Sequence, residues 1–244
     1  MTKVEAIQKV MEDNGGTASL ELIYENICKY YPAAKDSDKW DAGIRGVLYR
    51  EIRNKRRFKK IGLSIYALED YEEEAKPTAK DSVRMHSYIE GICIELGNFN
   101  GFDTFTADPS AFYRDKLQLK NIITLPELPP FSYPQILHEA KRIDVVWFNR
   151  TGLAFPQKVF EVVDSINTLN GAFNRSLQLQ NFRTEFFIVA PEKHRDKFTQ
   201  TIELEIYQES KDRFTFVNYD DIQNLYESTL KTKKMESLVF GKLQ

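Results

Sequence analysis

Two carboxylates, Asp144 and Glu161, interrupt apolar segments that lie near each other in this sequence, RIDVVWF at 142–148 and KVFEVV at 158–163. An ionised carboxylate within an apolar strand is costly unless it meets a counter-charge or a cation. Two such groups facing each other would repel without a cation, and carboxylate oxygens are ligands that Mg²⁺ prefers. The sequence therefore predicts a magnesium site held by Asp144 and Glu161.

The segments that carry these carboxylates are rich in β-branched and aromatic residues, and turn residues separate them, so we expect two adjacent strands. In a symmetric hairpin that turns at Gly152 and Leu153, facing residues have numbers that add to 305, as those of Asp144 and Glu161 do. Facing Cβ atoms lie about 4.5 to 5.5 Å apart, which lets both carboxylates reach one cation. Pro156 lacks a backbone N–H and favours a bulge in this hairpin.

A structural alternative remains open for these two carboxylates. One of them would pair with Arg142, Lys158 or Arg175, or the strand face would be open to solvent.

Further elements must position the pair. Apolar spacing predicts helices over 82–97 and 168–182, and EFFIVA predicts a strand at 185–190. The order helix, strand, strand, helix, strand predicts an α/β sandwich. The region before the two strands predicts mostly loop because four prolines break it, Pro126, Pro129, Pro130 and Pro134.

The first 70 residues predict three helices and a hairpin, the order of a winged helix-turn-helix. Ser19 is the expected N-cap of the second helix, the third helix is expected over 38–53, and Gly62 is the expected turn of the hairpin. Nine bases and only two acids lie between residues 39 and 60. A basic third helix and wing predict DNA binding. The bases are Lys39, Arg45, Arg50, Arg53, Lys55, Arg56, Arg57, Lys59 and Lys60.

The segment WDAGIRGVLYREIR, followed by RFKKIGLSIYAL, resembles the HARE-type winged helix that is found fused to restriction-endonuclease and chromatin proteins. The resemblance covers residues 1–70 and implies a DNA-binding domain. A protein-binding or RNA-binding role for the basic helix is the alternative.

The motifs IDVVW, FEVVDS, FNRSLQL and FFIVAPEKHRDKF resemble the PD-(D/E)XK restriction-endonuclease-like superfamily, over about residues 82–230. This resemblance implies a phosphodiesterase in which Asp144 and Glu161 hold Mg²⁺. It also implies an accessory acid at Glu90 and phosphate-positioning groups at Arg175 and Gln178. The expected function is a Mg²⁺-dependent DNA endonuclease of restriction or defence type, and cutting both strands favours a homodimer.

One position departs from the superfamily pattern. The residue two places after the glutamate is normally Lys, or Glu in the nearest branch, but here it is Val163, which neither binds a metal nor polarises water. The alternative function is therefore a catalytically impaired nuclease fold that binds DNA or senses its modification.

Composition and spacing exclude other classes. The chain has 244 residues and a net charge of −2, and it contains no long apolar run, so we expect a folded cytoplasmic protein that does not enter a membrane. Cys28 and Cys93 predict no disulfide framework. His86, His138 and His194 lack ligand spacing, which argues against a zinc site. An acidic, proline-containing stretch predicts a linker at 71–81 between domains at 1–70 and 82–244.

Overall fold

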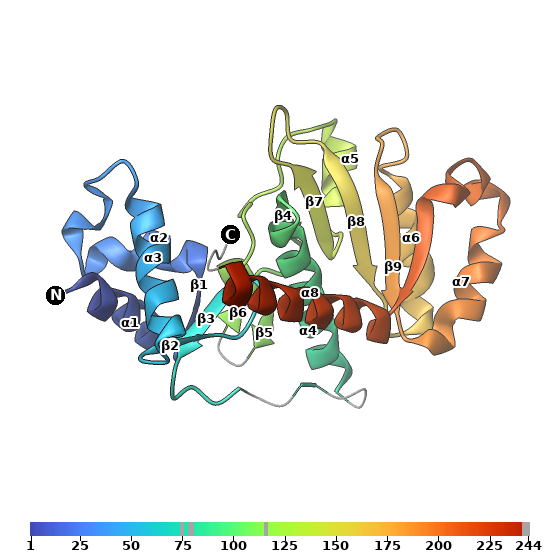
Figure 1. Cartoon of the computed structure of the whole chain (residues 1–244). Coiled ribbons are helices and arrows are strands. Elements are labelled where there is room, and N and C mark those ends of the chain that lie inside the picture. The colour runs from blue at the N-terminus through green and yellow to red at the C-terminus, as the bar shows by residue number, and fades with distance from the viewer. Residues whose placement is uncertain (74–75, 78–80, 115–116, 241–244) are drawn as a thin grey trace.

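The computed structural model describes residues 1–73, 76–77, 81–114 and 117–240, and it shows a mixed α/β protein (Figure 1). The predicted linker at 71–81 falls partly outside the described residues, and so does the end of the predicted domain at 82–244. No helix in the described ranges is long and apolar enough to cross a membrane.

The N-terminal part contains the three expected helices and the expected hairpin. Ser19 caps the second helix by accepting a hydrogen bond from the Leu22 N–H, as its position predicts. The hairpin is joined by a strand that the sequence did not predict, because this strand is only three residues long. The elements are α1 (Lys3–Asp13), β1 (Thr17–Ser19), α2 (Leu20–Asn26), α3 (Trp40–Arg53), β2 (Phe58–Lys60) and β3 (Ile65–Leu68), with short 3₁₀ turns at Ile27–Lys29 and Pro32–Lys35. The strands form an antiparallel sheet in the order β1-β3-β2.

The C-terminal part is built on a mixed five-stranded sheet in the order β10-β9-β8-β7-β4. Its strands are β4 (Phe102–Thr106), β7 (Val145–Asn149), β8 (Pro156–Val162), β9 (Glu185–Ala190) and β10 (Phe214–Asn218). β4, β7 and β8 are antiparallel neighbours, whereas β8, β9 and β10 run parallel. β5 (Phe112–Arg114) and β6 (Leu117–Gln118) form a separate small ribbon.

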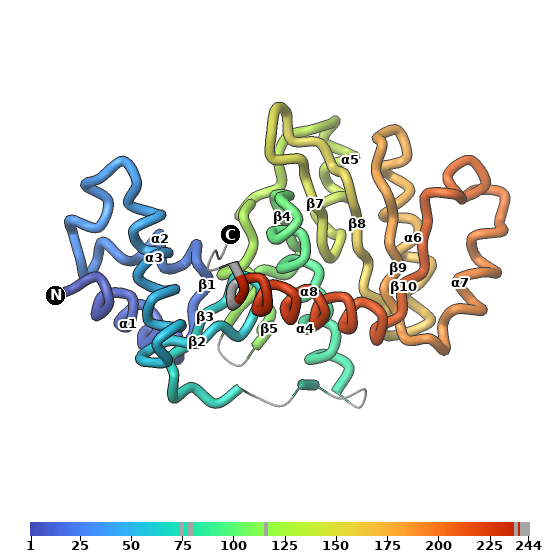
Figure 2. Tube along the Cα trace, in the orientation of Figure 1, coloured from blue at the N-terminus to red at the C-terminus, as the bar shows by residue number. Residues whose placement is uncertain are grey.

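Helices cover both faces of this sheet, and alternate strand residues fill the two resulting cores. Val145 and Phe160 face the core shared with α4 (Ser82–Phe99) and α8 (Tyr219–Phe240). Val146 and Val159 face the opposite core, which contains residues of α5 (Pro134–Ala140), α6 (Leu169–Leu177) and α7 (Arg195–Ile202). From the end of β10, α8 runs back across the molecule toward the N-terminal sheet (Figure 2).

The predicted strand register is confirmed. Val145 pairs with Phe160, and Val146 with Val159, so facing numbers add to 305. The expected bulge is also present, because the register shifts where Phe148 pairs with Pro156. The alternation places Glu161 and Val163 on the same face of the sheet, the α6 side.

Two sequence predictions need correction. The region before β7, predicted as mostly loop, contains β4, the short β5–β6 ribbon and α5. The helix predicted at 168–182 ends at Leu177, because the chain continues as turns. β4 was missed because Phe105 is its one buried apolar residue, beside the buried but polar Thr104 and Thr106, and a short edge strand gives a weak pattern.

The β2–β3 turn is packed against α4. Glu95 on α4 is fully buried and accepts hydrogen bonds from the N–H groups of Leu63 (2.6 Å) and Ser64 (3.2 Å). A Cβ at Gly62 would lie 2.6 Å from the Glu95 carboxylate, so this close approach requires glycine. The hairpin turn is therefore attached to the helix that begins the C-terminal part.

Candidate metal centre

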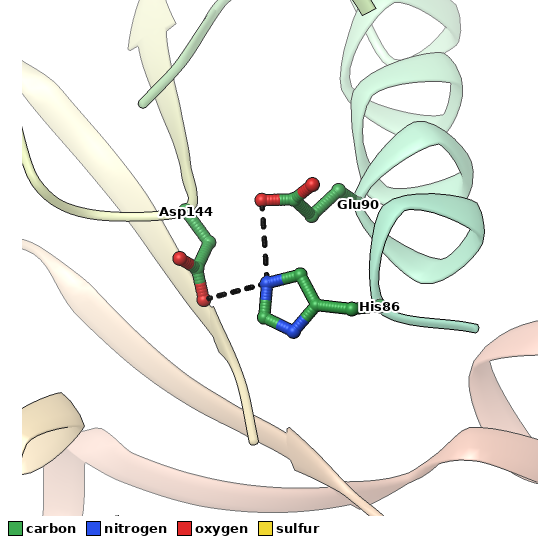
Figure 3. A group of neighbouring side chains, drawn as sticks. All are labelled: His86, Glu90 and Asp144. Atoms are coloured by element: carbon green, nitrogen blue, oxygen red, sulfur yellow. Dashed lines mark ion pairs between the residues drawn. The ribbon is translucent and has the colours of Figure 1, made fainter. Parts of the chain in front are cut away.

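Three side chains that can ligate a metal gather where α4 passes the start of β7. His86 and Glu90 lie one turn apart on α4, and Asp144 directly precedes β7 (Figure 3). His86 Nε2 is 3.6 Å from Glu90 Oε1 and 3.8 Å from Asp144 Oδ2. One ligand atom from each of the three residues lies within 4.8 Å of the other two. This spacing permits all three to bind one ion.

The α4 helix is held close to the sheet, which brings its side chains to Asp144. The Trp147 indole N–H donates to the Cys93 carbonyl at 3.1 Å. At Gly97 an added Cβ would lie 2.6 Å from the same indole nitrogen. Asp144 is fixed in turn, because its Oδ2 accepts a hydrogen bond of 2.7 Å from the Val162 N–H at the end of β8.

Asp164 holds the imidazole of His86 from the other side. Its Oδ2 lies 2.9 Å from His86 Nδ1, and the Tyr219 hydroxyl donates to its Oδ1 at 2.6 Å. His194 Nε2 lies 3.0 Å from the Asp164 backbone carbonyl. The hydrogen bond to Asp164 fixes the ring so that Nε2 faces Glu90 and Asp144 (Figure 3).

Glu161 is fully buried on the α6 side of the sheet, where its partner is Arg175 on α6. The guanidinium binds both carboxylate oxygens, with Nε 2.8 Å from Oε1. This is the pairing with Arg175 that the sequence left open as an alternative. Asp144 nevertheless lies near enough for its charge to raise the pKa of Glu161.

Burial and neighbouring charges shift the pKa values of this group. Burial raises the pKa of Glu90 to about 7, against the opposing effect of His86. Burial also raises the pKa of Asp144 and of Glu161. Burial lowers the pKa of His86, but Asp164, Glu90 and the charge of Asp144 outweigh it, and the pKa rises to about 11. Carboxylates in this environment gain from a positive charge among them.

The donor set fits a divalent cation. It offers carboxylate oxygens and one imidazole nitrogen, which bind such ions in proteins. Glu90 is only 2% exposed, and its Oε2 has no hydrogen-bond partner among the described residues. Buried polar atoms are normally satisfied, so this oxygen has capacity for a ligand.

A pocket of about 660 Å³ opens beside the cluster. His86, Glu90 and Asp164 contribute to its wall, together with the exposed ring of Phe112. The pocket gives solutes a path to the α4 side of the metal-ligating group.

The other predicted site residues lie apart from this cluster. Gln178 is exposed at the end of α6 and donates to the Asn174 carbonyl at 3.4 Å. Val163 is buried among apolar side chains of the α6-side core, so it offers no group to the site.

The nine predicted DNA-binding bases of residues 39–60 divide into two groups. Five have partners within the protein: Arg45 binds Asp41 and Tyr24, Arg50 forms an ion pair with Glu51 at 3.9 Å, Arg57 donates to Gln8, Lys59 donates to the Tyr71 carbonyl, and Lys60 is half-buried near the Tyr66 ring. Burial lowers the pKa of Lys60 to about 8. The other four, Lys39, Arg53, Lys55 and Arg56, are exposed, and so are Arg50 and Arg57.

Sequence reasoning missed His86 and Asp164. The histidines were judged by their spacing from one another, although the useful signal was the four-residue spacing from His86 to Glu90 on one helix face. Asp164 lies on the face opposite Glu161, and its contact with His86 depends on the packing of α4 on the sheet.

The fold and the cluster together define an α+β protein with metal-ligating side chains grouped at the end of a central strand pair. A comparison with protein-family models matches residues 67–241 to the type II restriction enzyme NmeDI C-terminal domain. The match covers most of the chain, and the chain belongs to this family. Membership indicates a restriction-type, DNA-related function. Searches of curated proteins and of solved structures found no match.

Proposed function

We propose that this protein is a metal-dependent DNA endonuclease of restriction type. The observation that carries the proposal is the convergence of Glu90, Asp144 and His86 beside an open pocket in a chain of a restriction-enzyme family. Buried carboxylates that face one another have a high cost in a purely structural role. A hydrolytic site that uses a divalent cation accounts for their grouping.

Each residue has a part in this proposal. Asp144 and Glu161 hold Mg²⁺ or a related divalent ion, and Glu90 is the accessory acid. A bound ion of this kind supplies an activated water and stabilises charge on a scissile phosphate. Arg175 and Gln178, at the C-terminal end of α6, position the phosphate. The strand register supports the Asp144–Glu161 pair, because it places the two positions opposite each other.

The N-terminal part binds the DNA in this proposal. The order of its helices and strands supports a winged helix, and the mixed sheet with its flanking helices supports a PD-(D/E)XK nuclease domain in the C-terminal part. Bases exposed on and after α3 bind the phosphate backbone, which positions the duplex. Two copies form a homodimer in the cytoplasm so that both strands are cut.

Plasmid cleavage tests the proposal. Purified protein should cut unmodified or methylated plasmid with Mg²⁺ or Mn²⁺ and should stop when the metal is chelated. The Asp196→Asn variant, which changes an exposed acid on α7, is the matched control and should retain activity. Cleavage that continues in a chelator would contradict the proposal.

A second candidate function is a DNA-binding or modification-sensing protein without cleavage. Two observations favour it: Val163 is buried and inert, and Glu161 is already neutralised by Arg175. This candidate predicts salt-dependent duplex binding and intact plasmid under every metal condition.

A further inference from the structure

We propose that His86 is a ligand of the divalent cation through Nε2, which lies beside Glu90 and Asp144 where α4 packs on the sheet. This inference rests on the proposed metal-dependent function and deepens it. It adds an imidazole nitrogen, and Glu90 as a direct ligand, to the carboxylate site proposed above, and it predicts a preference for Mn²⁺ over Mg²⁺.

The distances support a shared ion. Ligands bound to one cation at about 2.1 Å lie about 3 to 3.5 Å apart. The separations of 3.6 and 3.8 Å from His86 Nε2 to the two carboxylates are slightly wider. All three ligand atoms lie within 4.8 Å of one another, so movements of about 1 Å bring them to one ion.

The orientation of the ring supports ligation rather than a surface contact. Metal-binding histidines generally use their second ring nitrogen to donate to a carboxylate or carbonyl, which fixes the tautomer. Asp164 occupies this position at Nδ1, and Tyr219 holds Asp164. Because Asp164 holds the Nδ1 proton, a cation that displaces the Nε2 proton would meet an Nε2 lone pair directed toward Glu90 and Asp144.

The unsatisfied Glu90 oxygen is an independent indication of a ligand. Oε2 is buried and has no hydrogen-bond partner among the described residues, although Oε1 of the same group lies near His86. A cation at the centre of the three side chains would give this carboxylate a second interaction.

The donor chemistry decides the metal preference. Mg²⁺ favours an all-oxygen environment, whereas an imidazole nitrogen suits transition metals, whose affinity rises along the first row from Mn²⁺. A site that combines carboxylates with one imidazole therefore binds Mn²⁺ more tightly than Mg²⁺.

Pulsed electron paramagnetic resonance of Mn²⁺ bound to the full chain tests the assignment. With ¹⁵N-labelled histidine, the wild type should show a nitrogen coupling to Mn²⁺. The coupling should be lost in His86→Ala and retained in His138→Ala, which changes an exposed histidine. In the wild type, Mg²⁺ should displace the bound Mn²⁺ only when the Mg²⁺ concentration is well above the Mn²⁺ concentration.

Mn²⁺ affinity measured by titration adds a second readout. Asp164→Asn should weaken binding by about 10- to 100-fold while circular dichroism confirms a folded protein, because the imidazole loses its support. This variant keeps the test decisive if His86→Ala does not fold. A coupling that persists in His86→Ala, or bound Mn²⁺ without coupling in the wild type, would overturn the assignment. Coupling in a protein that never cuts DNA would support the assignment and contradict the proposed nuclease function.

Discussion

The pair formed by Arg175 and Glu161 gives a prediction whose size follows from burial. Arg175→Met keeps an unbranched side chain but removes the guanidinium that binds both oxygens of a fully buried carboxylate. Removing one partner of a buried ion pair costs about 3 to 5 kcal/mol. The Arg175 side chain is 22% exposed, so we expect the lower end, about 3 kcal/mol, and a fall in Tm of about 6 to 12 °C for a chain of this size.

The effect should depend on pH in a defined direction. Burial, and then Asp144, raise the pKa of Glu161, while Arg175 lowers it. Without Arg175 the folded-state pKa of Glu161 rises further above its unfolded-state value of 4.5. The destabilisation of the variant should therefore be largest at a pH well above 4.5 and smallest at a pH near 4.5. Urea unfolding at pH 8 and at pH 5 measures the difference.

Two controls separate this explanation from general damage. Arg142→Met removes an exposed arginine that pairs with Glu139 and should change stability by no more than about 0.5 kcal/mol. Glu161→Gln in the Arg175→Met background should recover most of the loss. A loss under about 1 kcal/mol at pH 8, or an equal loss at both pH values, would refute the reasoning.

Three further predictions concern the contact of Glu95 with the β2–β3 turn, the titration of Glu90 and His86, and DNA binding. Glu95→Ala should destabilise the protein by about 3 kcal/mol or more in urea unfolding, because buried donors from the β2–β3 turn and from Tyr113 and Tyr226 lose their acceptor. A urea unfolding midpoint equal to that of the wild type would show that Glu95 does not stabilise these donors. The metal-free protein should lose stability between pH 5 and pH 8, because burial raises the pKa of Glu90 to about 7 and the folded state holds protons that the unfolded state releases. His86 acts in the same direction, because its contribution to the stability of the fold is complete below pH 6.5 and is lost as the pH rises toward its folded-state pKa of about 11. A free energy of unfolding that rises between pH 5 and pH 8 would be inconsistent with the raised pKa values of both Glu90 and His86. Arg53→Ala with Arg56→Ala should weaken duplex binding and reduce the salt slope by about 2, whereas Lys60→Ala, at a half-buried lysine, should change the slope by less. Fluorescence anisotropy at several salt concentrations measures this slope, and equal slopes for the wild type and the double variant would show that these arginines do not contact phosphate.

Local patterns were enough to predict the elements that carry the carboxylates. The β-branched strands and the turn between them determined the register, and the lack of an N–H at Pro156 explained the bulge. Ser19 marked the start of α2 because its short side chain can accept the hydrogen bond of a helix N-terminus.

The parts that the sequence did not predict depend on contacts between distant segments. The contact from Asp164 to His86 spans 78 residues and exists only because α4 packs on the sheet. The choice of Arg175 among three possible partners of the carboxylates likewise follows from the position of α6 beneath β8. β1 contains three residues, too few for a periodic pattern, and is defined by its pairing with β3.

Binding and cleavage of the same labelled duplex, measured in one Mn²⁺ buffer for the wild type and for Asp144→Asn and Glu161→Ala, test the central claim most directly. The account predicts similar DNA affinity for all three proteins and a fall in the cleavage rate of about 100-fold or more in each variant. Cleavage at the wild-type rate in either variant, or no cleavage by the wild type at saturating DNA and metal, would contradict it.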